Sequence, residues 1–413
     1  MKLPKISRKF RLPLYIILSI ILGTAAGLVF KKYIYGTADV IGTIFLNLLK
    51  LITVPLIFTS ISTGVISLSN SKNLGRLGLK TVAYYLISSL VAIITGLTLT
   101  NIIKPGTGSN LSTLLKPVEN LNIEAISLRD IIVRMFPPNI FESFAKGDML
   151  PVIIFSIIIG FFISRAATRS RILLSRILES AFELMMKITE FILRLAPIGI
   201  FGIVAKIVST TGLDIFANLG KYFLTVLTGL LIHYFVSLPL FIYILTKLNP
   251  YKHMANMAPA LLTAFSTASS SATLPLTLEC AEVNSGISNK ISSFVFPLGA
   301  TINMDGTALY ECSAAIFISQ VYGVDLSFGQ QFIVIFTALL ASIGAAGIPM
   351  AGLVMLVIVL RSVGLPTEGI GIILAVDRIL DMIRTSTNVW SDSTGAIIIA
   401  STENEIDNAI FNN

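Results

Sequence analysis

Long apolar runs alternate with short polar segments through the first 250 residues of the chain. Each of the longest runs holds enough apolar residues to cross the ~30 Å hydrocarbon core of a bilayer as a helix. These runs cover residues 12–31, 38–68, 80–103, 128–165, 173–209 and 217–247. Several exceed the length of an upright crossing, so the pattern predicts tilted or broken helices.

Prolines inside these runs predict where the helices bend, because proline lacks a backbone donor and clashes with the preceding turn. Pro55 and Pro197 are positioned to kink the second and fifth runs. Pro137, Pro138 and Pro151 are expected to divide the fourth run into pieces.

The pattern changes after residue 250, where two apolar segments are interrupted in the middle. Residues 259–278 read PALLTAFSTASSSATLPLTL, with a Ser/Thr-rich centre, and residues 331–360 are broken by SIGAAGIPMAG at 342–352. Non-helical backbone at membrane depth is tolerated where it is buried in protein or lines a cavity. We therefore interpret both segments as re-entrant hairpins; the alternative for each is a spanning helix kinked by Gly and Pro.

Each interrupted segment precedes a long apolar segment that carries polar residues. GATINMDGT, residues 299–307, follows the first, and DRILDMIRTSTNVWSD, residues 377–392, follows the second. Two hairpin-plus-helix units in corresponding positions are typical of secondary transporters with internal repeats and a site near the bilayer midplane. The chain is therefore predicted to be an all-α polytopic membrane protein with inverted repeats.

The polar side chains of residues 377–392 share one face of their helix. At about 100° per residue, they fall within a stripe roughly 100° wide. The stripe consists of Asp377, Asp381, Arg384, Thr385, Asn388 and Asp392. Ionised groups at bilayer depth face a protein interior or a wet cavity, so the stripe predicts a polar site. A structural ion-pair ladder is disfavoured because acids, hydroxyls and amides outnumber the one arginine on the stripe.

Composition and charge agree with a membrane protein. Of the 413 residues, 54% are hydrophobic and 13% are charged, whereas soluble domains are about 25% charged. The net charge of +8 comes from short basic clusters between the apolar runs, and no single basic face suggests nucleic acid. Clusters at residues 2–11, 72–80, 165–176 and 247–252 fall on one side if the chain crosses once per run. That side is predicted to be the cytoplasm.

The basic first residues and the apolar run after them also resemble a signal peptide. That alternative is disfavoured because further spans follow, and with hairpins that do not cross, both termini are expected in the cytoplasm. Cys280 and Cys312 lack CxxC spacing, and His233 and His253 are single. We therefore expect buried thiols and no catalytic metal.

Oxygen-bearing residues in the two polar segments favour an alkali cation as ligand. Asn303 and Asp305 lie inside an apolar helix, where Gly306 weakens the helical hydrogen bonds. Freed carbonyls and carboxylates form the oxygen environment that hard cations prefer. We therefore predict Asn303, Asp305, Asn388 and Asp392 as cation ligands.

Arg384 and Asp381 indicate a substrate that carries both a negative and a positive charge. The planar guanidinium of Arg384 is suited to a carboxylate held by two bonds. Asp381, one turn away on the same face, is placed to meet an ammonium. Together they suggest an amino acid with an acidic side chain, whose other carboxylate binds donors of the hairpin tips. The alternative is that Arg384 only neutralises Asp381.

Several motifs resemble the signature sequences of the glutamate transporter family of sodium-coupled dicarboxylate and amino-acid symporters. They are SSSATLP, NMDGTALYE, SIGAAGIP and DxxLDxxRTxxNVxxD, in that order and at similar spacing. YYLISS at residues 84–89 and PPNIFESFAKGDMLPVIIF at 137–155 are also similar to family segments. The resemblance therefore covers nearly the whole chain.

This resemblance implies a homotrimer in the cell membrane, each protomer with eight transmembrane helices, two re-entrant helical hairpins and an elevator mechanism. Residues 1–79 and 106–210 would form the scaffold with helices 1, 2, 4 and 5, and residues 80–105 helix 3 of the transport domain. Residues 211–413 would complete that domain with helix 6, hairpin 1 (about 257–279), helix 7 (about 290–322), hairpin 2 (about 332–361) and helix 8 (about 369–401).

The resemblance also implies a set of site residues. Substrate contacts would come from Ser269, Ser270, Thr307, Ile348, Gly352, Asp381, Arg384, Thr385 and Asn388. Co-transported sodium would bind at one site to Gly299, Asn303, Asn388 and Asp392, and at a second to Thr301, Ser342, Ile343 and Ala345. A third site would use Tyr85, Ser88, Ser89, Asn303 and Asp305.

The chain departs from the family pattern near the substrate. Many members carry a further arginine at one of two positions, where this chain has Ala268 and Met382. Glu311 resembles a position associated with proton and potassium coupling in animal members; alternatively it pairs with Arg378. Trp390, the only tryptophan, lies off the polar stripe and is expected to face lipid or another helix.

The sequence thus favours a sodium-driven symporter for aspartate or glutamate over other classes. A proton-coupled glutamate or C4-dicarboxylate symporter is the nearest alternative. An ion channel could use the same oxygen ligands, but the Arg384–Asp381 pair favours a carrier. An enzyme is not expected, because an intramembrane protease would need a GxGD motif, or a GxSG serine with a histidine, and the chain shows neither.

Overall fold

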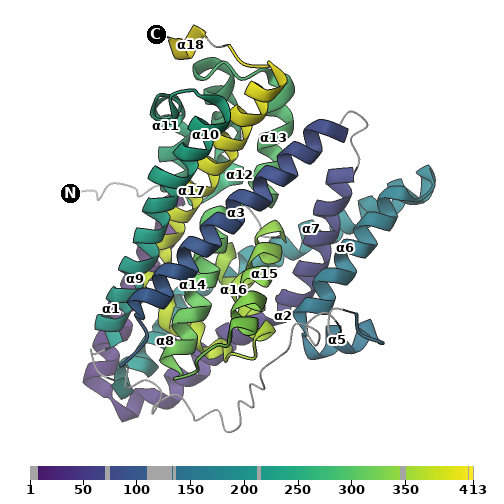
Figure 1. Ribbon diagram of the computed structural model, residues 1–413. Coiled ribbons are helices and arrows are strands. Elements are labelled where there is room, and N and C mark those ends of the chain that lie inside the picture. The colour runs from purple at the N-terminus through teal and green to yellow at the C-terminus, as the bar shows by residue number, and fades with distance from the viewer. Residues whose placement is uncertain are drawn as a thin grey trace.

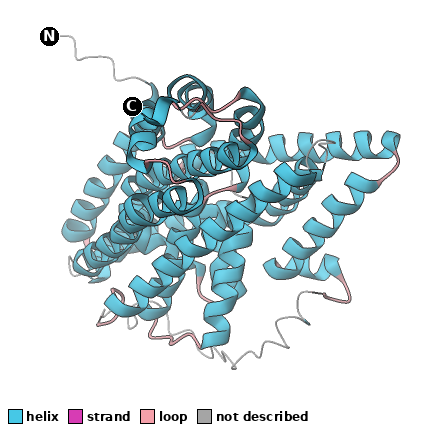
Figure 2. Ribbon diagram, turned by 45° about the horizontal axis from the view of Figure 1, so that its top comes forward, coloured by secondary structure: helices cyan, strands magenta, loops and turns pink. Residues whose placement is uncertain are grey.

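Helices account for most of the described chain, as the apolar runs predict (Figures 1 and 2). The computed structural model describes residues 8–69, 75–108, 133, 136–211, 215–344, 350–407 and 409–412. Within these ranges, extended pairing is limited to an isolated antiparallel bridge between Ile287 and Ile406. The described part of the protein is therefore helical.

The first six apolar runs form the helices that the pattern predicts, several of them in pieces. These are α1 (Arg8–Phe30), α2 (Lys32–Ser69), α3 (Gly75–Ile103), α5 (Ile140–Lys146), α6 (Met149–Arg165), α7 (Thr168–Arg194), α8 (Ala196–Thr211), α9 (Ile215–Ile232), a π-helical turn η2 (His233–Ser237) and α10 (Leu238–Thr246).

The breaks in these helices follow only some of the prolines. Pro197 lies in the first turn of α8, which is bent by 50° from α7, as predicted. The fourth run divides at Gly147, whose φ of 67° is left-handed. Pro151 does not cause this break: it lies in the first turn of α6, where proline is tolerated. The helix α2 continues through Pro55.

The second part of the chain holds the interrupted segments and the polar helices. Its elements are α11 (Pro250–Thr267), α12 (Ser270–Glu279), η3 (Cys280–Asn284), α13 (Asn289–Ile302), α14 (Asp305–Val321), α15 (Phe328–Gly344), α16 (Ala351–Ser362), η4 (Thr367–Gly369), α17 (Ile370–Glu403) and α18 (Ala409–Asn412).

Both interrupted segments consist of two helices packed on each other. α11 ends at Ala268, in the left-handed conformation with φ of 51°, and the hydroxyl of Ser269 accepts a hydrogen bond from the N–H of Ala272 at 3.2 Å. α12 then packs back against α11, and α16 packs against α15. The connection at residues 345–349 lies outside the described residues.

The two polar segments fold differently. NMDGT lies at a break, because α13 ends at Ile302, Asn303 and Met304 are not helical, and α14 begins at Asp305. Gly306 follows the break and lets α14 approach α17: a Cβ there would lie 2.7 Å from the carbonyl oxygen of Arg384. By contrast, α17 is continuous over 34 residues.

α17 is the central element of the second part of the chain. Figure 1 shows it, in yellow, running beside α9, α10 and α11, and it also packs against α13 and α14. One apolar cluster is built from α3, α10, α11, η3, α13 and α17. A second joins α1, α2, α6 and α8 to α14, α16 and the start of α17. The polar stripe of α17 is therefore enclosed by helices.

Length and hydropathy identify three described helical stretches able to cross a membrane: Lys32–Ile66, Arg76–Ile103 and Leu219–Thr246. The bent pair α7 and α8 adds a fourth if it forms one span. This is fewer than the eight crossings that the resemblance implies.

Candidate substrate and cation site

Helix α17 buries its polar stripe, as the periodicity predicts. Asp381 is 5% exposed and Arg384 is 1% exposed, and Asn388 and Asp392 are also buried. The stripe faces the break between α13 and α14, since contacts from Asn303 and Gly306 reach Asp392 and Asn388. Charged and amide groups of two polar segments therefore meet inside the protein.

Asp381 accepts three hydrogen bonds, two of them from arginines. Its Oδ1 accepts a hydrogen bond from Nη2 of Arg384 at 2.9 Å. Its Oδ2 accepts one from the backbone N–H of Met350 at 3.0 Å and one from Nη1 of Arg378 at 3.2 Å. Met350 directly precedes α16, so this acid ties α17 to the second interrupted segment.

Arg384 keeps donors available for a ligand. One edge of its guanidinium is used, because Nη2 lies 3.2 Å from Asp377 as well as near Asp381, and the group stacks 3.7 Å above the ring of Tyr310. Among the described residues, its Nε and Nη1 have no hydrogen-bond partner. Nη1 approaches Gly352, where a Cβ would lie 3.2 Å away. Two buried guanidinium nitrogens whose N–H groups have no acceptor are a strong indication of an anionic ligand.

Asn388 joins the stripe to the start of α14. Its Oδ1 accepts from the N–H of Gly306 at 2.8 Å, and its Nδ2 donates to the hydroxyl of Thr307 at 3.2 Å. Thr307 also lies close to Gly352. Asn388, Thr307, Gly352 and Arg384 therefore lie close to one another.

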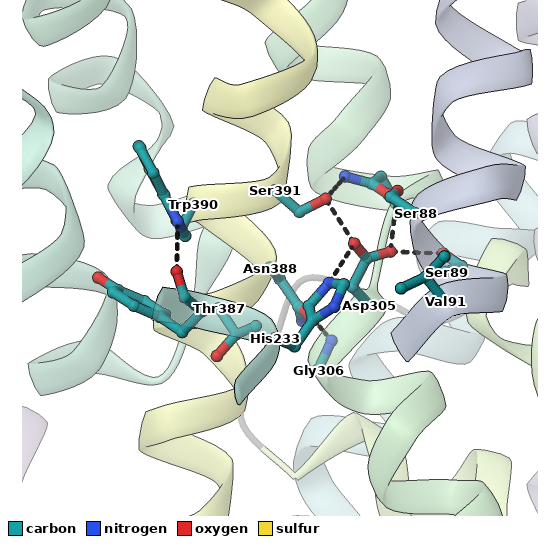
Figure 3. Close-up of polar contacts among 12 residues, drawn as sticks. Ser88, Ser89, Val91, His233, Asp305, Gly306, Thr387, Asn388, Trp390 and Ser391 are labelled. Atoms are coloured by element: carbon teal, nitrogen blue, oxygen red, sulfur yellow. Dashed lines mark hydrogen bonds and ion pairs between the residues drawn. The ribbon is translucent and has the colours of Figure 1, made fainter. Parts of the chain in front are cut away.

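A second group of contacts centres on the carboxylate of Asp305 (Figure 3). Its Oδ1 accepts from the hydroxyls of Ser89 at 2.6 Å and Ser88 at 3.3 Å. Its Oδ2 accepts from the hydroxyl of Ser391 at 2.6 Å and lies 3.0 Å from Nε2 of His233. Hydroxyls both donate and accept, so these serines can turn lone pairs toward a cation beside Asp305.

Asn303 connects this group to Asp392. Its Nδ2 donates to Oδ1 of Asp392 and to the hydroxyl of Ser391, both at 2.9 Å. Gly299 packs against the same carboxylate, and a side chain there would overlap Asp392. The two acids, the amide and the hydroxyls form a dense set of hard oxygen donors, which fits an alkali cation.

Other residues of the predicted set are placed differently. The hydroxyl of Tyr85 donates to the carbonyl of Val295 at 2.8 Å, and that of Thr385 to the carbonyl of Asp381 at 2.8 Å. Ser270 donates to Ala300 at 3.2 Å, which joins α12 to α13. Thr301 and Ser342 donate to their own helices. These hydroxyl groups all donate to backbone carbonyls. The second cation site is predicted to bind its ion through backbone carbonyls and not through side chains, and one of them is the carbonyl of Ile343. Ala345 and Ile348 lie outside the described residues.

Three contacts at the site were not found from the sequence. Arg378 reaches Asp381 although it lies off the stripe; its spacing of three residues, the same as between Asp381 and Arg384, could have revealed it. His233 and Ser391 both reach Asp305. They come from different helices, and no local pattern indicates that pairing.

The structure also shows where Trp390, Glu311 and the two cysteines lie. The indole of Trp390 is fully buried and donates to the carbonyl of Tyr234 at 3.0 Å, which agrees with a helix-facing position (Figure 3). Glu311 is buried, and neither carboxyl oxygen has a hydrogen-bond partner among the described residues. Its suggested pairing with Arg378 is thus not formed within that part of the chain. Cys280 and Cys312 are both buried.

Apolar helical spans, with charged groups and oxygen ligands enclosed beside two interrupted helical units, are features of a membrane transporter. Residues 12–402 match the sodium:dicarboxylate symporter family, and the chain belongs to this family.

Related proteins cover most of the chain. It is 38% identical to excitatory amino acid transporter 3 of Homo sapiens over 409 residues, which is 87% of this chain and 78% of the relative. It is 37% identical to the proton/sodium-glutamate symport protein of Geobacillus stearothermophilus over 410 residues, 96% of each chain. Excitatory amino acid transporter 1 of Ambystoma tigrinum is 36% identical over 450 residues, 94% of this chain and 82% of the relative.

Proposed function

We propose that this protein is a secondary active symporter that moves aspartate or glutamate into the cell with sodium. The observation that carries this proposal is the buried Arg384, which holds Asp381 with one edge of its guanidinium and keeps Nε and Nη1 available. Relatives named for glutamate and for excitatory amino acids support the same substrate class.

The two charged groups select the substrate together. A C4-dicarboxylate has no ammonium for Asp381, and a neutral amino acid has no second carboxylate for Arg384. A ligand that lacks either charge forgoes the corresponding contact and is expected to bind more weakly. An acidic amino acid satisfies both. Its other carboxylate would bind Thr307, Asn388 and the tips of the interrupted segments, at Ser269, Ser270, Ile348 and Gly352.

Sodium is the proposed coupling ion. Asp392 with Asn303 and Gly299, and Asp305 with Ser88 and Ser89, form two adjacent groups of oxygen donors, each with one carboxylate to offset a cation. The second of the three proposed sites uses carbonyls of residues 301 and 342–345.

The proposed architecture is a homotrimer with eight crossings per protomer and α11–α12 and α15–α16 as re-entrant hairpins. The transport domain would move across the membrane like an elevator. The apolar cluster shared by α3, α10, α11, η3, α13 and α17 supports this domain, because all its members lie in the predicted transport segments. The basic segments support cytoplasmic termini.

Proton coupling is the second candidate, and Glu311 favours it. A buried carboxyl group without a hydrogen-bond partner among the described residues is favoured in its protonated form. A protonated Glu311 would carry one proton with the transport domain. A relative named as a proton/sodium-glutamate symport protein is consistent with this candidate.

Competition binding to the purified protein in sodium chloride tests the substrate class. Succinate and serine should displace labelled aspartate far less well than unlabelled aspartate or glutamate does. Arg384→Ala should weaken aspartate binding by about 2–5 kcal/mol, the range for breaking a buried charge pair. Succinate or serine competing as well as aspartate in the wild type would contradict the two-charge account.

A further inference from the structure

Asp381, the acid proposed to bind the substrate ammonium, already holds a second positive group. Nη1 of Arg378 donates to Oδ2 of Asp381 at 3.2 Å, and both side chains are 7% exposed. With Arg384 on Oδ1 and Met350 on Oδ2, this carboxylate has accepted three hydrogen bonds, and it offers about four lone pairs.

The two arginines are held to different degrees. Arg384 is fixed by Asp377 and by the ring of Tyr310 in addition to Asp381. For Arg378, the ion pair with Asp381 is its single ion pair among the described residues, and its Nε has no hydrogen-bond partner there. Without Asp381, Arg384 is still held in place by Asp377 and Tyr310, whereas no other ion pair among the described residues keeps Arg378 at the site.

An ammonium cannot simply be added to this arrangement. To donate to Oδ2 of Asp381 it would stand next to the Arg378 guanidinium, and two like charges at adjacent positions repel strongly in a buried site. One cation must leave the carboxylate when the ammonium arrives. The contacts above identify that cation as Arg378.

We propose that Arg378 is a displaceable counter-ion: it neutralises Asp381 when no substrate is bound, and the substrate ammonium replaces it. This inference rests on the proposed function. Arg378 is then a specificity-determining residue. When an anionic ligand without an ammonium binds, Arg378 stays paired with Asp381 and neutralises its charge. An amino acid must first compete with Arg378 for the same oxygen.

Removing the Arg378 charge should change the two ligand classes in opposite directions. In Arg378→Met, aspartate no longer displaces a guanidinium, so its Kd should fall by roughly tenfold, the change that 1.4 kcal/mol produces. Without the Arg378 charge, the negative charge of Asp381 is less well neutralised and repels the succinate dianion more strongly. The inhibition constant of succinate should therefore rise. Competition binding in sodium chloride measures both constants on the same purified protein.

Matched variants separate this role from a structural one. Arg378→Lys keeps the charge and should retain the wild-type ratio of aspartate to succinate binding. Arg361→Met removes a positive charge near the end of α16, nine residues beyond Gly352, and should leave the ratio unchanged. Size-exclusion chromatography and the fluorescence of the single tryptophan, Trp390, verify the fold, and Arg378→Gln replaces the Met variant if that one does not fold.

The outcomes are distinct. Tighter aspartate with weaker succinate supports the displacement. If a folded Arg378→Met or Arg378→Gln variant weakens both ligands alike, or changes neither, the counter-ion role is wrong. A wild type that binds no acidic amino acid would instead overturn the proposed function.

Discussion

At the scale of single residues, helical periodicity predicted that Asp381 and Arg384 meet on one helix, but it missed Arg378 on that helix and the contacts between helices. Asp381 and Arg384 were found because their spacing of three residues places them on one face, and their side chains are in contact at 2.9 Å. The contact of His233 with Asp305 spans 72 residues and depends on how η2 packs beside α14. No local pattern encodes such a pair, so the sequence could not reveal it.

Asp392 provides the test of the cation assignment at this scale. Asp392→Asn keeps the shape of the side chain but removes the charge that would offset a cation near Asn303 and Gly299. The sodium concentration that gives half-maximal aspartate binding should rise, by about tenfold for each 1.4 kcal/mol lost. Aspartate titrations at a series of sodium concentrations measure it.

A surface acid serves as the control for that variant. Asp39→Asn breaks the half-exposed ion pair with Lys206, which is 2.6 Å long and joins α2 to α8 away from the stripe. Sodium dependence should stay at the wild-type value in Asp39→Asn. An Asp392→Asn protein with wild-type sodium dependence would show that Asp392 is no cation ligand.

At the scale of elements, the existence of the helices followed from hydropathy, but their ends depended on local chemistry. The α7–α8 bend was predicted from Pro197, whereas the α5–α6 break lies at Gly147 and not at Pro151. Asn303 was expected to lie inside a helix loosened at Gly306, whereas the helix is broken at Asn303 and Met304. At the break, the backbone of Asn303 is extended, and its side chain donates to Ser391 and Asp392.

The segments that connect the helices test the predicted membrane topology. Ser170, between α6 and the body of α7, should lie in the cytoplasm, and Thr107, after α3, should lie outside; both are exposed. Single cysteines at these positions should react with an impermeant thiol reagent from opposite sides of the membrane. The buried Cys280 and Cys312 give a low background. Labelling of residue 170 in intact cells would contradict the predicted orientation.

At the scale of the whole molecule, the helices pack in two sets, which one apolar cluster also joins. α1, α2, α6, α7 and α8 pack on one another, and α3 and α9–α14 pack around α17. Composition and hydropathy predicted a membrane protein but could not assign helices to groups, because packing partners are set by the shapes of apolar faces that hydropathy does not describe. The grouping came from the family resemblance.

The central claim is that the inward sodium gradient drives accumulation of an acidic amino acid. Uptake of labelled aspartate into proteoliposomes containing the purified protein tests it most directly. With sodium chloride outside and potassium chloride inside, aspartate should accumulate above its external concentration, saturably, and collapse of the sodium gradient should stop it. Equal accumulation on a proton gradient without sodium would contradict the account.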